Sequence, residues 1–356
     1  MPKDILPKGF GFWSAALLIG LFLPLIADGP GFLGDCALFA IWASLNVMWS
    51  LVLGTAGIQS FATLAIAGAS GYAATYSSLR WGISWPLMLV IGTAFGALVG
   101  LVVAIPAIRL RGIYFALLTF GLAQLFRSYT TVTDALGGAR GMYGADSFIP
   151  LDMIGTKSGA MIGYYAGFGM LILALLIYLA VDGGRLGLLL RTARESEPFA
   201  RALGIDVVRA RMAVFLVSSA MMGFVGAFYA SYYRGVSPSI FDFSTLLLLF
   251  AMIVVGGLGS ARGVLIGTAI LLFINQHWLE AGPARLIAAA LLMYLVSIFT
   301  DKGLVGIPEQ IRRWSAVRRV RRMGGAANPA AAPALVGVGA DTQDRSAPAA
   351  ANVERT

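Results

Sequence analysis

The chain has 356 residues, of which 58% are hydrophobic and 12% are charged, whereas roughly a quarter of the residues of a soluble domain are charged. This composition excludes a soluble globular fold and predicts an all-α, polytopic membrane protein. The formal net charge of +9 indicates no nucleic-acid partner, because the basic residues gather in loops on one predicted side of the bilayer. One cysteine and one histidine exclude an internal disulfide and a histidine-rich metal site.

Long charge-free stretches predict about ten transmembrane helices, because roughly 20 apolar residues cross the hydrocarbon core as a helix. The second stretch has about twice the length that one crossing needs. We therefore expect it to cross twice, with a break near residues 54–57. In chain order the stretches are 9–27, 36–79, 81–108, 112–126, 158–181, 212–233, 243–261, 263–279 and 286–300.

Basic residues predict the orientation of these helices. With the N-terminus inside, 20 Lys and Arg residues fall on the inner side and 6 on the outer side, which places both termini and the loop 182–211 in the cytoplasm. We interpret residues 9–27 as an uncleaved first span, because no small-residue cleavage site follows them. The predicted membrane domain is 1–307. A basic juxtamembrane segment, 308–323, and a disordered cytoplasmic tail, 324–356, follow it.

Two segments contain polar side chains where a predicted helix crosses the membrane. They are VLGTAGIQSFATLAIAGASGY, residues 52–72, and RLRGIYFALLTFGLAQ, residues 109–124. Unwound backbone and polar groups at membrane depth suit the lining of a substrate pathway. Glycines and small hydroxyl side chains suit tight helix packing equally well, so both interpretations stay open. The candidate lining residues are Gly57, Gln59, Ser60, Thr63, Thr119 and Gln124.

The loop 182–211 is densely charged, although both flanking stretches carry no charge. Its centre, ESEPFARALGID at 195–206, predicts a short helix with Pro198 in the first turn and Gly204 at the end. We expect Phe199, Ala200 and Leu203 to lie together on one face of this helix. Two turns of helix are unstable alone in water, so the segment needs either a partner surface or the underside of the bundle.

The glycine-dense segment 250–267 contains a GGLG run, but the chain has no G-x-x-x-x-G-K-[ST] frame for a phosphate loop. We therefore expect no cofactor bound by this chain. If ATP drives transport, ATP and Mg²⁺ would bind to another subunit.

Four segments in this order, 52–72, 109–124, 191–215 and 254–267, resemble the permeases of branched-chain amino acid ABC transporters, specifically the LivM type. The resemblance runs from about residue 36 to residue 307. It implies an importer of leucine, isoleucine and valine in the bacterial cytoplasmic (inner) membrane that works by alternating access. The implied partners are a second homologous permease of the LivH type, two cytoplasmic ATPase subunits and a periplasmic solute-binding protein.

The resemblance also implies that the loop 182–211 carries a coupling helix that docks on an ATPase. Pro198 and Phe199 depart from the small residues usual in the family at those positions, whereas four of the following residues match. The outer segment 136–146, LGGARGMYGAD, matches its family counterpart only loosely. The candidate coupling residues are Glu195, Glu197, Ala200, Ala202, Leu203 and Gly204.

Three alternatives remain. A permease of the same family for urea or short amides would have the same architecture. A secondary transporter working alone is disfavoured, because no Asp or Glu lies deep in a predicted span to couple an ion. A membrane-embedded enzyme is disfavoured further, because the spans hold no paired carboxylates and no Cys/His pair.

Overall fold

A computed structural model of the protein describes residues 20–24, 29–107, 110, 112–277, 284–300 and 303–306. All of these lie within one compact unit, Met1–Ile307. The predicted basic segment 308–323 and the predicted tail 324–356 lie outside the described residues, as does most of the predicted first span, 9–27.

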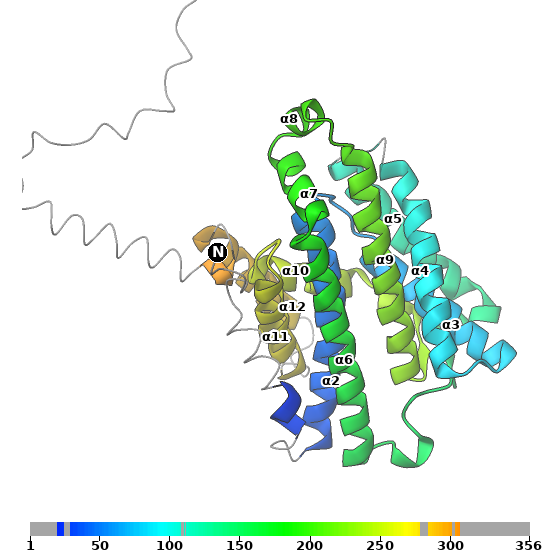
Figure 1. The fold of residues 1–356 in the computed structure, drawn as a ribbon. Coiled ribbons are helices and arrows are strands. Elements are labelled where there is room, and N and C mark those ends of the chain that lie inside the picture. The colour runs from blue at the N-terminus through cyan, green and yellow to red at the C-terminus, as the bar shows by residue number, and fades with distance from the viewer. Residues whose placement is uncertain are drawn as a thin grey trace, which may run out of the picture. The chain divides into compact units, whose positions relative to one another are not determined.

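The described residues form an almost entirely helical bundle, which confirms the predicted fold class (Figure 1). Two short strands, β1 (Met142–Tyr143) and β2 (Gly235–Val236), pair antiparallel. Short 3₁₀ turns lie at Asp134–Leu136, Gly138–Arg140, Leu151–Met153, Pro238–Phe241 and Leu304–Gly306. The α-helices are α2 (Pro30–Ser50), α3 (Thr63–Trp81), α4 (Trp85–Ala107), α5 (Ile113–Val132), α6 (Lys157–Asp182), α7 (Arg185–Glu195), α8 (Glu197–Ala202), α9 (Val207–Tyr232), α10 (Phe243–Gly256), α11 (Ala261–His277) and α12 (Ala284–Phe299).

Several of these helices have the length and composition that a bilayer requires. Among the described residues, Pro30–Thr55, Trp85–Pro106, Lys157–Asp182 and Val207–Tyr232 are long and apolar enough to cross. Phe243–Gly256, Ala261–Gln276 and Ala289–Ile298 are shorter apolar helices. The protein is therefore a multi-pass membrane protein, and the count of about ten crossings stays a prediction.

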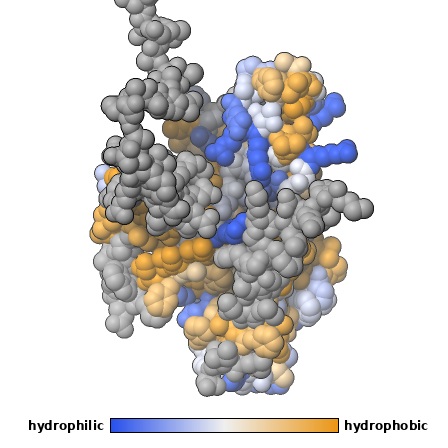
Figure 2. All heavy atoms as spheres, turned by 60° about the vertical axis from the view of Figure 1, so that its left-hand side comes forward, coloured by the Kyte–Doolittle hydropathy of each residue, from blue (hydrophilic) through white to orange (hydrophobic). Residues whose placement is uncertain are grey.

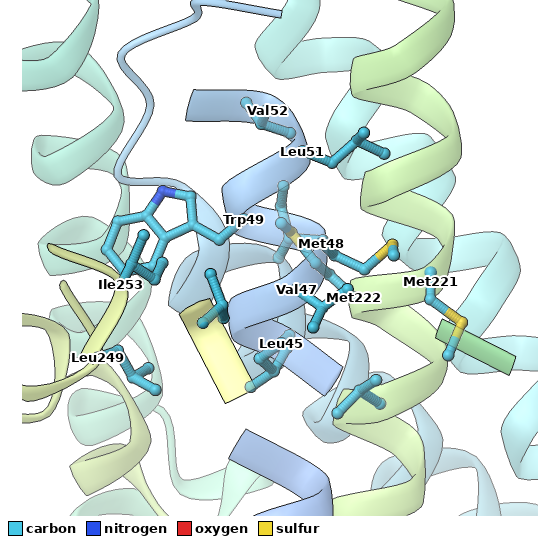
Figure 3. Packing of buried hydrophobic residues seen from close by; sticks show 14 of the residues in the cluster. Leu45, Val47, Met48, Trp49, Leu51, Val52, Met221, Met222, Leu249 and Ile253 are labelled. Atoms are coloured by element: carbon cyan, nitrogen blue, oxygen red, sulfur yellow. The ribbon is translucent and has the colours of Figure 1, made fainter. Parts of the chain in front are cut away.

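The helix α2 lies in the middle of the apolar core, between α9 and α10 (Figure 3). Met48 of α2 points toward Met221 and Met222 of α9, whereas Trp49 points the other way, toward Ile253 of α10. Trp49 and Met48 are fully buried. A helix that is apolar on all sides belongs inside a bundle. Residues 43–50 of α2 are all buried, whereas its first turns expose Phe32 and Asp35.

Glycines bring α4 and α9 into close backbone contact. A Cβ atom added to Gly96 of α4 would lie 2.6 Å from the Cα of Gly223 on α9 and 2.7 Å from the carbonyl oxygen of Ser219. Gly92 and Gly100 of α4 also face small residues of α9 at such distances. This spacing of small residues is typical of membrane helices whose backbones touch.

Charge-free stretches proved to be imprecise markers of helix ends. The helix α5 continues beyond the predicted end at residue 126 and includes Arg127. The Arg127 guanidinium forms an ion pair with Asp242 at 3.0 Å. The helix α9 begins five residues before the predicted start, where the Asp206 side chain caps it by accepting a hydrogen bond from the Arg209 amide at 3.0 Å. Charged residues can therefore lie within a helix near its end, or next to that end, when they form an ion pair or cap the helix.

Candidate coupling site

The predicted break between α2 and α3 is present. After α2 the chain makes a π-helical turn, Leu51–Thr55, and then runs without helical structure until α3 begins at Thr63. Gly57 has a φ of 67°, a left-handed conformation that glycine adopts at no steric cost. Backbone groups in such a break must find other partners, because lipid offers none.

Side chains from neighbouring helices supply those partners. The Trp49 indole donates a hydrogen bond to the Ser60 carbonyl at 2.7 Å. The Phe61 amide donates to the Thr119 hydroxyl of α5 at 2.9 Å, and the Ser60 hydroxyl accepts from the Ala62 amide at 3.2 Å. Ser60 and Thr119 thus stabilise the shape of the break.

The segment that follows α6 is hydrogen-bonded directly to this break. The Arg194 guanidinium of α7 donates a hydrogen bond to the Gly54 carbonyl. A Cβ atom added to Gly57 would lie 3.5 Å from the Cγ of the same arginine. On a second side, the Thr55 hydroxyl donates to the Asp182 carboxylate at 2.8 Å, and Arg191 pairs with that carboxylate as well. The end of α6 and the helix α7 therefore both contact the chain at the start of the break.

The segment contains two helices, whereas the sequence analysis predicted one. Residues 185–195 form α7, so Glu195 ends that helix and is not part of α8, which contains the other predicted helical coupling residues. Gly187, Leu190 and Ala193 are the buried side of α7. Their three-residue spacing is the amphipathic signal that was missed, because dense charge was interpreted as a loop.

The helix α8 has the predicted beginning and end. Pro198 lies in its first turn, and Gly204 follows it with a φ of 77°. The predicted common face is wrong in one respect. Phe199 and Leu203 are 57% and 60% exposed, but Ala200 is 0% exposed and packs with Ala193 of α7. Positions 199 and 203 share a helix face, and Ala200 lies on the inner one.

Glu197 forms two ion pairs, one within α8 and one with α9. It lies 2.8 Å from Arg201 in the same helix and 3.1 Å from Arg211 of α9. Arg211 was not among the predicted site residues, because it lies 14 positions after Glu197 in the chain. The other candidates of this segment, Ala202 and Glu195, are exposed.

A cavity of about 130 Å³ lies where the break, α8 and α9 meet. It brings together Gly57 and Gln59 from the predicted pathway set with Glu197 from the predicted coupling set. The remaining lining residues are Ile58, Ala104, Leu110, Gly112, Phe115, Val208, Arg211, Met212 and Phe215. The cavity thus lies between α8 and the membrane bundle, and its walls are mostly apolar, with Gln59, Glu197 and Arg211 as polar side chains.

The other predicted pathway residues do not line this cavity. Ser60, Thr63 and Thr119 are buried within the packing around the break. The Gln124 amide lies 3.5 Å from the Phe241 carbonyl, at the contact between α5 and the turn before α10. Gly54 and Gly68 are in tight packing, against Gly259 and the ring of Phe241 respectively. Tight packing in the segment 52–72 is therefore present at Gly54 and Gly68, whereas a substrate pathway past Gly57 and Gln59 stays a prediction.

The α8 end of the molecule exposes apolar and charged side chains next to each other (Figure 2). We call the exposed pair Phe199 and Leu203 the docking face. Large apolar side chains at a protruding, charged end of a protein suit a partner with an apolar pocket.

The sequence pattern described as "Branched-chain amino acid transport system / permease component" matches residues 33–300, which include the break, α7, α8 and the cavity. The chain belongs to this permease family. No solved structure matches the chain significantly.

Relatives of two types share the family. The chain is 24% identical over 337 residues to the high-affinity branched-chain amino acid transport permease LivM of Salmonella typhimurium, covering 85% of this chain and 78% of that protein. It has the same identity over 335 residues to LivM of Escherichia coli K12. It is 23% identical over 292 residues to LivH of Salmonella typhimurium, covering 75% of this chain and 92% of that permease.

These matches confirm the resemblance to LivM-type permeases. Members of the branched-chain amino acid permease family are transport subunits, in agreement with the expectation that the chain is not itself an enzyme. Relatives named LivM and LivH indicate a transport system with two homologous permeases.

Proposed function

We propose that this chain is the LivM-type permease subunit of an ATP-driven importer of leucine, isoleucine and valine. The main structural support for the ATP-driven mechanism is a hydrogen bond from Arg194 to the Gly54 carbonyl. It joins the α7–α8 segment to the break between α2 and α3. A protruding segment joined in this way can pass motion from a partner into the membrane bundle.

The partners in this proposal are a second permease of the LivH type, two cytoplasmic ATPase subunits and a periplasmic solute-binding protein. The ATPase subunits bind ATP and Mg²⁺ and receive the docking face, Phe199 and Leu203. The predominance of basic residues on one side supports a bacterial inner-membrane protein with both termini and α8 in the cytoplasm.

In this mechanism, closure of the ATPase pair displaces α8, and α7 moves with it. The Arg194–Gly54 hydrogen bond and the Thr55–Asp182 hydrogen bond transmit the displacement to the break. The bundle then alternates between two packings, and ATP binding needs to change their relative free energy by only a few kcal/mol.

The test is saturable uptake of labelled leucine at low concentration by cells with and without this gene, in a strain that lacks other leucine importers. The proposal predicts that uptake requires the gene and that isoleucine and valine compete. Unchanged leucine uptake without the gene, or competition by urea alone, would move the substrate to urea or a short amide.

A further inference from the structure

A second cavity, of about 530 Å³, lies at the end of the bundle opposite α8. It is formed by the first turns of α2 and α6, the segment before α6 and the end of α9. Sites for small molecules usually have volumes of roughly 300–1,000 Å³. We call it the outer pocket, after the side of the membrane on which the basic residues place it.

Arg234, directly after α9, lines the outer pocket. Its Nη1 atom is buried and has no hydrogen-bond partner among the residues that the structure describes. A buried guanidinium nitrogen without an acceptor is costly, because it has lost its water without a replacement. The Arg234 side chain is only partly buried and lines the pocket, so an anionic oxygen in the pocket would satisfy this nitrogen after a small rotation of the guanidinium.

The backbone of Arg234 has a conformation that arginine rarely adopts. Its φ is 57°, and Arg234 is the only non-glycine residue in the described part of the chain with a positive φ. Glycine and asparagine adopt this conformation most readily. The Arg234 carbonyl accepts hydrogen bonds from the amides of Gly144 and Ala145, at 2.8 and 3.1 Å, and any residue could supply that carbonyl. The side chain is therefore the feature that distinguishes arginine at this turn.

The walls of the outer pocket add to the positive potential. Gly31 lies in the first turn of α2, and Thr156 and Gly159 lie at the N-terminus of α6. Helix N-termini carry a partial positive charge. The N-cap of α2 is Gly29, which has no side chain to accept from the first-turn amides.

The outer pocket also has features for the rest of a small molecule. Asp35 directly follows Gly34, which lines the pocket, and its carboxylate accepts a hydrogen bond from the Gln276 amide at 3.4 Å. A carboxylate there suits an ammonium group. Ile149 and Met153 supply apolar walls, and a Cβ added to Gly31 would meet nothing within 4 Å, so the space is open.

We propose that the outer pocket binds an amino acid with an apolar side chain, and that Arg234 binds its carboxylate. The choice of solute rests on the proposed function, whereas the carboxylate site rests on Arg234 and the cavity. The outer pocket would hold the solute before it enters the pathway.

The test measures binding to the complete transporter in lipid nanodiscs, without the solute-binding protein. The probes are L-leucine, leucinamide, which lacks the carboxylate, and 4-methylpentanoate, which lacks the amine. Arg234→Asn keeps a residue that tolerates positive φ but removes the cation. We expect it to weaken leucine and 4-methylpentanoate binding about tenfold or more, the loss of one charge-assisted hydrogen bond, and to leave leucinamide binding unchanged.

Two further variants sharpen the result. Gly31→Leu fills the open space without backbone strain and should weaken binding of all three probes. Arg140→Gln removes an exposed arginine on the same side of the molecule and should change nothing. Equal leucine affinity in Arg234→Asn and wild type would overturn the inference, as would a phospholipid that occupies the pocket and excludes leucine.

The outcomes separate this inference from the proposed function. Leucine transport by the wild type together with unchanged binding by Arg234→Asn would overturn the outer pocket alone. Absence of leucine transport together with Arg234-dependent binding of 4-methylpentanoate would overturn the proposed function and support the carboxylate site.

Discussion

The Arg194 guanidinium donates a hydrogen bond to the Gly54 carbonyl, which joins residues 140 positions apart in the chain. One of them lies on α7, and the other lies in the π-helical turn with which the break begins. Because the turn leads directly to Gly57 and Gln59 in the cavity wall, this hydrogen bond connects the protruding segment with the cavity.

Removing this connection should uncouple ATP hydrolysis from transport. Arg194→Gln deletes a hydrogen bond to a charged group, worth about 1.5–3 kcal/mol, so we expect uptake to fall about tenfold or more. The ATPase rate of the purified complex should change little. Arg185→Gln, at an exposed position of the same helix, is the matched control. Equal losses of uptake and ATPase activity would indicate an assembly defect and contradict the coupling role.

Gly204 permits a test of the turn that ends α8. Its φ is 77°, and a Cβ there would meet nothing within 4 Å, so a substitution acts through the backbone and not through a clash within this chain. Gly204→Val should cost about 1–2 kcal/mol in this conformation and abolish uptake, with the protein still inserted in the membrane. Gly204→Asn tolerates the same φ and should keep most of the uptake. Wild-type transport by Gly204→Val would contradict the coupling role of this turn.

The two ion pairs of Glu197 should differ in strength. The pair with Arg201 is an exposed i,i+4 pair, worth about 0.3–0.5 kcal/mol. The pair with Arg211 is less exposed and joins two helices, so its coupling free energy should be larger, about 1 kcal/mol or more. Double-mutant cycles with Glu197→Gln, read by resistance to denaturant-induced unfolding, measure both. Equal coupling energies would show that Arg211 does not anchor α8.

Close packing of α4 on α9 should make Gly96 intolerant of any side chain. In Gly96→Ala the new methyl group would meet backbone atoms of α9 at 2.6–2.7 Å, and such overpacking costs about 1–3 kcal/mol. Gly121→Ala on α5 meets nothing within 4 Å and should be neutral or stabilising, because alanine favours helix over glycine. Thermal unfolding in detergent compares the two. Similar melting temperatures would contradict the proposed contact.

Sequence patterns predicted those features of the fold that depend on residues close together in the chain. The break near Gly57 and the limits of α8 at Pro198 and Gly204 follow from the conformations that these residues favour. The fold class follows from composition. These features need no knowledge of which helices touch.

Sequence patterns alone did not predict the long-range contacts. The bond from Arg194 to Gly54 and the pair of Glu197 with Arg211 depend on helix packing, which single-chain patterns do not encode. The inward position of Ala200 has the same origin, because α7 covers that face of α8. The three-residue spacing of Gly187, Leu190 and Ala193 could have predicted the helix α7. The many charged residues of this segment were instead interpreted as a sign of a loop.

The most direct test of the account is accumulation of labelled leucine in proteoliposomes that contain the complete transporter and its binding protein. We expect accumulation with ATP and none with a non-hydrolysable analogue, with competition by isoleucine and valine but not by urea. Accumulation driven by an ion gradient without ATP, or inhibited by urea alone, would contradict the account.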